Sequence, residues 1–236
     1  MGRKSAKIAA KKGAADKAKS QVYTKALHDV ATAVKSGGGD PDTNFLLRIA
    51  LDRCRKFNVP KDNIDRAIKR GLGGDGEGYT DVTYEGYGPG GVAVFVETST
   101  NNVTRTVANV RSYFNKTGGS LGKDGSLQFI FDRKAVFTVP KENIDEDEFT
   151  LEMIDAGAED IETEDGMFEV TGPMESFGTI QNKLEELGTK PEEAGLQRIP
   201  NNLKAVDDDD TLTQLERLID LLESDEDVVT VYHNIE

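Results

Sequence analysis

Residues 160–173 read DIETEDGMFEVTGP, and this stretch decides how the rest of the chain is divided. Its centre, Asp165-Gly166, is the pair of residues that most strongly favours a tight β-hairpin turn. The hairpin lies between two helical patterns, at residues 146–156 and 174–187, with a short strand pattern on the outer side of each. The resulting order, β-α-β-β-α-β, is that of the ferredoxin-like fold. The sequence therefore predicts a complete α+β domain over residues 135–206.

The residues before this domain predict a second α+β unit that lacks its last two elements. Residues 79–134 show two strands around a glycine-rich loop, then a helix, then a strand that contains Leu127, Phe129 and Phe131. The missing helix and strand are predicted at the end of the chain, where leucines at helical spacing precede an apolar run at residues 228–232. We therefore expect one discontinuous domain, residues 79–134 plus 207–236, with the acidic domain inserted into it.

The first third of the chain predicts a small helical bundle. Residues 21–73 contain three amphipathic patterns: three glycines end the first, Asp40-Pro41 begins the second and Pro60 begins the third. A glycine-rich linker at residues 72–78 separates the bundle from the next domain. The expected fold class is α+β, with an N-terminal three-helix bundle followed by two ferredoxin-like α+β domains, one inserted in the other.

Charge is distributed unevenly along the 236 residues. Residues 1–70 contain 17 Lys and Arg against 7 Asp and Glu, a net charge of +10, whereas the whole chain carries −14. Residues 1–20 hold seven basic residues and one acidic residue with few large apolar side chains, so we expect a basic flexible arm. A cationic end on an acidic protein favours a polyanionic partner, and we interpret it as a sign of nucleic-acid binding.

The candidate nucleic-acid-binding residues are basic side chains from three regions. They belong to the arm, to the helical bundle and to the predicted helix 102–117, although a solvated helix face explains those in the last region equally well. The set is Arg3, Lys4, Lys7, Lys11, Lys12, Lys17, Lys19, Lys25, Lys61, Arg66, Lys69, Arg70, Arg105 and Arg111.

Two glycine motifs resemble nucleotide-binding loops but lie in the wrong context. Gly86-x-Gly88-x-x-Gly91 matches the dinucleotide fingerprint, which requires a helix after the loop to hold the pyrophosphate. Residues 92–96, VAVFV, predict a strand instead. Gly122-Lys123 lacks both the first glycine and the hydroxyl residue of a phosphate-binding P-loop. We therefore expect no nucleotide cofactor.

Candidate catalytic and metal-binding residues are equally few. His28 and His233 are not in a metal-binding spacing, and Cys54 lies on an apolar helical stripe, where a core thiol is a better interpretation than a nucleophile. The acidic run at residues 207–210 fits the start of a helix better than a cation site. We expect no catalytic residue, metal, cofactor or small-molecule substrate.

The sequence also indicates the expected compartment. No stretch approaches the roughly 20 consecutive apolar residues of a membrane-spanning helix. The single cysteine excludes an intrachain disulfide. We expect a soluble protein of a reducing compartment, the cytoplasm, with no membrane partner.

Five segments of the chain resemble the YebC/PmpR family of transcriptional regulators. They are NVPKDNIDRAIKRG (58–71), TYEGYGPGGVAV (83–94), RTVANVR (105–111), GGSLGKDGSLQFIF (118–131) and VYHN (231–234). The resemblance covers nearly the whole chain and implies three domains, the third inserted in the second. Members usually begin G-H-S-K-W, whereas residues 2–6 here read GRKSA and the chain contains no Trp. The positive charge of this segment is therefore kept, but its aromatic side chain is missing.

The resemblance implies a nucleic-acid-binding regulator of gene expression with no enzymatic activity. We interpret the chain as a DNA-binding transcriptional regulator that acts through its basic arm and helical bundle. The alternative is a ribosome-associated translation factor that relieves stalling and whose partner is rRNA. The resemblance includes this alternative because mitochondrial relatives are translational activators of cytochrome oxidase and bacterial relatives have been linked to ribosomes stalled on proline runs. The sequence indicates neither the target genes nor an oligomeric state.

Overall fold

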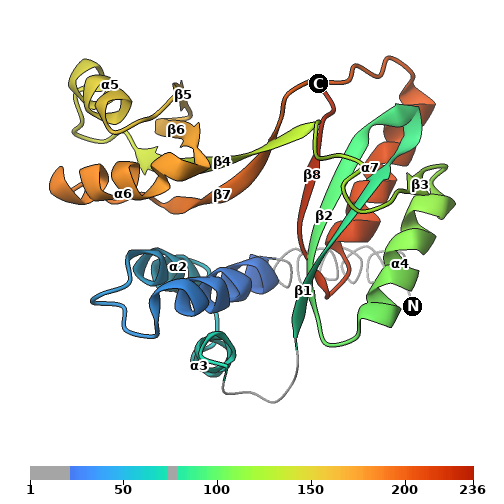
Figure 1. Cartoon of the computed structure of the whole chain (residues 1–236), viewed down its shortest axis with the longest axis horizontal. Helices are drawn as coiled ribbons and strands as arrows, with labels where there is room; N and C mark the ends of the chain where they lie inside the picture. Colours follow the sequence, from blue (N-terminus) through green and yellow to red (C-terminus); the bar gives the residue numbers. More distant parts are fainter. Residues whose placement is uncertain (1–21, 74–78) are drawn as a thin grey trace, which may run out of the picture.

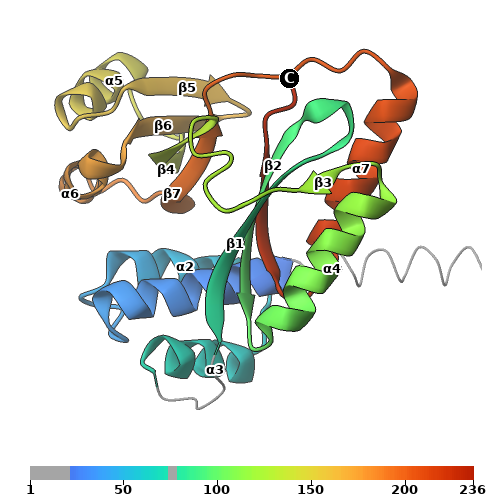
Figure 2. The ribbon, with the colours of Figure 1, turned by 45° about the vertical axis from the view of Figure 1, so that its right-hand side comes forward.

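The computed structural model describes residues 22–73 and 79–236. It contains a helical domain and two four-stranded antiparallel sheets, each with its own helices (Figure 1; Figure 2). The predicted α+β class is confirmed. The predicted arm, residues 1–20, lies outside the described residues, as does most of the linker. No helix in the described ranges is long and apolar enough to cross a membrane.

The helical domain consists of a helix over residues 22–37, α2 (Phe45–Lys56) and α3 (Lys61–Gly71). The start of α2 differs from the prediction, because Pro41 lies in a turn and Asn44 is the helix cap. The Asn44 side chain accepts the Leu47 N–H at 3.1 Å and donates to the Ala33 carbonyl at 2.8 Å. One buried amide therefore caps α2 and joins it to the first helix, which a proline at the turn cannot do.

The inserted domain (residues 131–200) has the predicted element order. It contains β4 (Phe131–Pro140), α5 (Glu146–Asp155), β5 (Asp160–Glu164), β6 (Met167–Pro173), a 3-10 turn (Met174–Ser176), α6 (Phe177–Glu186) and β7 (Glu193–Pro200). The strands lie in the order β5-β6-β4-β7. Asp165 and Gly166 both have positive φ, 50° and 78°, which confirms the hairpin turn.

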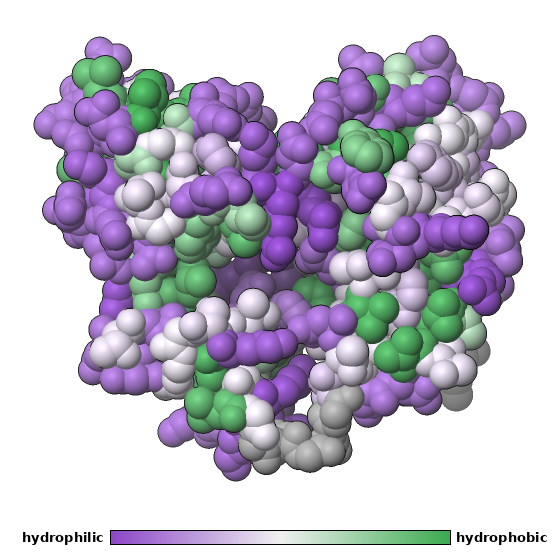
Figure 3. Space-filling view, in the orientation of Figure 1, coloured by the Kyte–Doolittle hydropathy of each residue, from purple (hydrophilic) through white to green (hydrophobic). Residues whose placement is uncertain are grey.

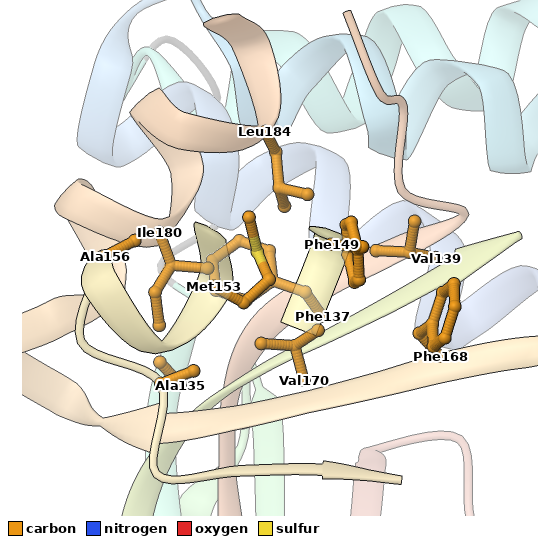
Figure 4. Close-up of a cluster of buried hydrophobic side chains, with 11 residues drawn as sticks. Ala135, Phe137, Val139, Phe149, Met153, Ala156, Phe168, Val170, Ile180 and Leu184 are labelled. Carbon is orange, nitrogen blue, oxygen red and sulfur yellow. The ribbon is translucent and has the colours of Figure 1, made fainter. Parts of the chain in front are cut away.

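Helices α5 and α6 cover one face of this sheet. Their side chains meet those of β4 and β6 in a single apolar cluster (Figure 4). Phe149 of α5 stacks on Phe168 of β6 at 4.7 Å between ring centroids. Strand β4 begins several residues before the predicted strand at Val136, because Phe131 pairs with Pro200. The two long strands β4 and β7 thus form a ribbon that connects the inserted domain to the rest of the chain (Figure 1).

The central domain (residues 79–130 and 201–236) is assembled from both sides of the insertion. It contains β1 (Thr80–Tyr87), β2 (Ala93–Thr100), α4 (Val103–Lys116), β3 (Ser120–Leu121), α7 (Asp209–Glu223) and β8 (Val228–His233). The strand order is β3-β1-β2-β8, so the last strand of the chain pairs with β2. Helices α4 and α7 cover one face through Phe114, Leu215 and Leu218. The glycine-rich loop forms a short 3-10 turn (Pro89–Gly91), and the predicted strand after it is confirmed as β2.

Close packing requires a glycine at one position of this loop, and the turn requires a glycine at another. A Cβ at Gly86 would lie 2.7 Å from both the Phe114 ring and the Ser120 carbonyl oxygen. Gly90 has a φ of +70°, a conformation that side chains other than glycine rarely adopt. The close approach of α4 and the sharp turn therefore account for two of these glycines.

The predicted strand containing Leu127, Phe129 and Phe131 is wrong. Residues 124–130 form turns, and only the two-residue β3 joins the central sheet from this region. The cause is Glu85, a 6%-exposed carboxylate that accepts the Gly125 N–H at 2.9 Å and the Leu127 N–H at 2.6 Å. These amides bond to a carboxylate instead of to a neighbouring strand. The loop buries Leu127 and leaves Phe129 81% exposed.

The Glu85 contacts predict a local effect of substitution. In Glu85→Gln, the amide keeps one acceptor oxygen but loses the charge and one of the two N–H contacts. We expect amide hydrogen exchange in residues 122–128 to accelerate about tenfold or more, the equivalent of one lost hydrogen bond to a charged group. Exchange measured by mass spectrometry checks this. Glu142→Gln, on an exposed turn, should leave it unchanged, and equal exchange in both variants would contradict the assigned role of Glu85.

Candidate nucleic-acid interface

Helix α3 presents its cations to solvent. Its apolar side, Ile64, Ala67 and Ile68, packs into the core of the helical domain, so the remaining face points outward. Lys61, Arg66 and Lys69 are all exposed, and no described carboxylate lies within ion-pair distance of any of them. Cations whose charge is not matched by a neighbouring carboxylate attract phosphate groups most strongly.

Arg70 and Arg111 occupy different surroundings. The Arg70 guanidinium lies 4.5 Å above the centre of the Tyr79 ring, a cation–π contact between α3 and the start of β1. Arg111 is exposed on α4 together with Lys116. These two cations line a shallow hollow together with the small side chains of Ala108 and Ser112. The sugar-phosphate backbone of a nucleic acid can approach α4 closely at this hollow.

Lys25 and Arg105 are bound to carboxylates of other domains or elements. Lys25 Nζ lies 3.5 Å from Glu193 of the inserted domain. Arg105 Nη2 lies 2.7 Å from Asp227 Oδ1, and its Nε donates to Oδ2 of the same carboxylate at 3.2 Å. Thr106 also donates to Asp227, at 2.8 Å. The sequence did not predict these ion pairs, which hold α4 against the turn before β8.

The predicted cations of the arm, Arg3, Lys4, Lys7, Lys11, Lys12, Lys17 and Lys19, lie outside the described residues. The structure therefore places Lys61, Arg66, Lys69 and Arg70 together on α3. Arg111 lies on α4, in another domain. Lys25 is paired with Glu193 of the inserted domain and is not part of the α3 group.

A cavity of about 430 Å³ lies where the three domains meet, and Figure 3 shows this hollow in the middle of one face. Charged side chains from every domain line it, among them Asp29, Arg53, Glu97 and Glu193. Burial raises the pKa of Asp29 to about 6, although Arg53, 3.1 Å away, favours the carboxylate. With Lys25 and Arg133, which also line it, the hollow is an interdomain space with three cations and three carboxylates.

The surroundings of His28 and Cys54, the two residues considered for catalysis in the helical domain, are those of packed side chains. His28 Nε2 lies 3.2 Å from the Thr32 hydroxyl, and burial lowers the pKa of its imidazole. Cys54 is fully buried in the helical domain, 3.7 Å from the Ala26 carbonyl oxygen, and burial raises the pKa of its thiol to about 11. The interpretation of Cys54 as a core thiol is confirmed.

The acidic run at residues 207–210 begins α7, as expected. The Asp208 side chain accepts the Thr211 N–H at 2.8 Å and also its hydroxyl, and these bonds lower the pKa of Asp208. Among residues 22–73 and 79–236, no group of three or more His, Cys, Asp or Glu side chains is arranged to hold a metal ion.

Comparisons with known proteins place both parts of the chain in one family. Residues 3–74 match the TACO1/YebC protein N-terminal domain, and residues 79–235 match the TACO1/YebC second and third domain. A relative from Finegoldia magna is 42% identical over 229 residues, which cover 97% of this chain and 95% of the relative. A relative from Syntrophotalea carbinolica is 46% identical over 232 residues, 98% of this chain and 93% of the relative. Each is named a probable transcriptional regulatory protein.

A solved structure shows the same fold. The crystal structure of a conserved hypothetical protein from Aquifex aeolicus superposes with a TM-score of 0.77 at 35% sequence identity. The match covers 92% of this chain and 89% of that one. The arrangement of the two sheets and the helical region is therefore shared with a structure determined by experiment.

The surroundings of Cys54 predict its reactivity. A thiol pKa of about 11 in place of about 9 lowers the thiolate fraction at pH 8 about a hundredfold, and burial blocks access to the sulfur as well. We expect iodoacetamide to modify Cys54 at least that much more slowly in the native protein than after unfolding in urea. Glu142→Cys provides an exposed thiol in the same chain as the control. Equal alkylation rates for the two native thiols would contradict the buried assignment.

Proposed function

The chain belongs to the TACO1/YebC family, and from this premise we propose that it is a DNA-binding regulator of transcription that acts in the cytoplasm. In this proposal the cations of α3 and of residues 1–20 bind the phosphates of the duplex. Two similar relatives carry the name of probable transcriptional regulatory protein. The proposal contains no catalytic step, since Cys54 is buried and its thiol is protonated at neutral pH.

The observation that carries the proposal is the outward face of α3. Lys61, Arg66 and Lys69 are exposed and have no ion-pair partner among the described residues, in a chain whose other helical-domain cations are largely paired. Each cation that neutralises a phosphate releases a counterion, so a short helix with several such cations gains affinity for nucleic acid in proportion. Arg70, which lies over Tyr79 beside them, extends the cationic face.

Two further regions join this surface in the proposal. The seven basic residues of residues 1–20 precede the first helix and add charge at the same end of the chain. Arg111 and Lys116 on the exposed side of α4 add a second contact in the central domain. Lys25 and Arg105 contribute less, because binding a phosphate requires each to leave a carboxylate.

The second candidate is a translation factor that binds rRNA on the ribosome. The composition of the outward face of α3 favours it, since sequence-specific reading of DNA uses Arg, Asn and Gln side chains against base edges. Asn63 is half-buried and Arg70 contacts Tyr79, so Arg66 is the one exposed side chain of this kind on α3 that has no such contact. A face made mainly of phosphate-binding cations is suited to a structured RNA backbone.

The α3 cations predict a change in the salt dependence of binding. Lys61→Gln/Lys69→Gln removes two phosphate contacts, so the slope of log affinity against log salt should fall by about 1.8, and duplex affinity should drop tenfold or more at about 0.1 M salt. Fluorescence anisotropy with labelled promoter DNA measures both. Lys204→Gln/Arg217→Gln removes the same charge from exposed positions in the central domain and should leave the slope unchanged.

The same measurements separate the two candidates. Tighter binding to one promoter than to other duplexes supports the transcriptional role. Equal affinity for every duplex, together with co-sedimentation of the wild type with ribosomes in low-salt sucrose gradients, supports the translational role. Equal slopes for the α3 and control variants would show that α3 does not bind nucleic acid in either candidate function.

A further inference from the structure

Ion pairs join the helical domain to the inserted domain. In four of them, cations of the first helix and α2 lie 2.7–3.5 Å from carboxylates near the end of α6 and the start of β7. In a fifth, Lys190 of the inserted domain contacts Asp52 of α2. The five pairs are Lys25–Glu193, Arg48–Glu185, Arg53–Glu193, Lys56–Glu192 and Lys190–Asp52.

The charges on α2 lie on one side of the helix. Arg48, Asp52 and Lys56 are spaced four residues apart, so they form one ridge, and Arg53 lies beside it. This side faces β7, which packs against α2. Three cations of α2 are therefore neutralised within the molecule, in contrast to those of α3.

The buried apolar clusters of the two domains are separate. The buried cluster of the helical domain and that of the inserted domain have no described residue in common. The cavity of about 430 Å³ lies between them (Figure 3). Apart from Arg53, whose side chain is 17% exposed, the side chains of the five pairs are 34–62% exposed. Ion pairs with this exposure are weak and sensitive to salt, because water and ions screen each pair.

The covalent connection of the inserted domain runs through the central domain and not through α2. The chain enters the domain through β4 and leaves it through β7, which pair with each other from Phe131 and Pro200 onward. The root of this ribbon is fixed to the central domain, where Arg198 stacks on Phe95 at 3.7 Å and its Nε donates to Glu97 at 3.2 Å. Beyond that root, β7 packs against α2, and the five ion pairs described above join the two domains.

We propose that the face of α2 formed by Arg48, Arg53 and Lys56 is a second binding surface for nucleic-acid phosphates, which Glu185, Glu192 and Glu193 occupy in the closed state. The inference rests on the proposed function and adds a competition to it. Carboxylates and phosphates bind to the same cations, so a polyanion and the inserted domain compete for one surface. The closed state lowers the apparent affinity in proportion to its population.

Matched charge variants test this inference. Glu185→Gln/Glu192→Gln/Glu193→Gln removes the three carboxylates that cover α2. Asp160→Asn/Glu162→Gln/Glu164→Gln removes the same charge from β5 of the same domain, where the side chains are exposed and contact no α2 cation among the described residues. We expect the first variant to bind duplex DNA about tenfold more tightly than the second, since a mostly closed protein would become mostly open. The same two variants are compared on duplex RNA of the same sequence.

A third variant changes charge in the opposite direction. Lys190→Glu places like charges together with Asp52 and should open the interface, although it makes the protein more acidic. The inference predicts tighter binding to the duplex for this variant. A purely global effect of charge predicts weaker binding, and that result would overturn the inference.

The opening itself is measured without nucleic acid. Dyes on Asp42→Cys and Glu142→Cys report the distance between the two domains by single-molecule energy transfer, while the buried Cys54 stays unlabelled. We expect high salt and the Glu185→Gln/Glu192→Gln/Glu193→Gln variant to lengthen this distance and the β5 variant to leave it unchanged. Equal distances and affinities for the two triple variants would overturn the inference even when wild type binds through α3. Wild type that binds no duplex would instead refute the proposed function.

Discussion

Arg53 is the side chain on which the arrangement of the domains depends. Its guanidinium lies 3.1 Å from Asp29 of its own domain and 2.8 Å from Glu193 of the inserted domain, and only 17% of the side chain is exposed. A guanidinium withdrawn from water needs partners, because an uncompensated buried charge is costly. These two carboxylates therefore determine where β7 lies against α2, and with it the shape of the space among the three domains.

The uneven charge of the chain has a structural meaning once the domains are in place. The acidic inserted domain is directed toward the cations of α2, whereas α3 turns its cations away from it. The paired cations of the first helix and α2 thus join the domains. Lys61, Arg66 and Lys69 of α3 are available for a partner. A net charge counted along the sequence does not distinguish these two roles, because it contains no information on which carboxylate lies opposite which cation.

Several features that the sequence predicted are local ones. The Asp165-Gly166 turn, the stripe that buries Cys54 and the helix start at Asp208 depend on neighbours within a few residues, and the structure confirms them. The error at residues 127–131 came from Glu85, a carboxylate about forty residues away that removes backbone donors from a strand. Likewise, Arg105 and Asp227 are more than a hundred positions apart, so no local spacing in the sequence predicts their ion pair.

The position of β8 has a consequence for how the protein is made. Strand β2 pairs with β8, from Val94 with His233 to Thr98 with Val228, although the whole inserted domain lies between the two strands in the chain. While the nascent chain emerges, the side of β2 that β8 will cover has no partner, although the helical and inserted domains, each continuous in sequence, are already able to collapse. Closure of the central sheet consequently waits until the inserted domain and β8 have been made, and loss of β8 would leave an open edge on β2 that is available for aggregation.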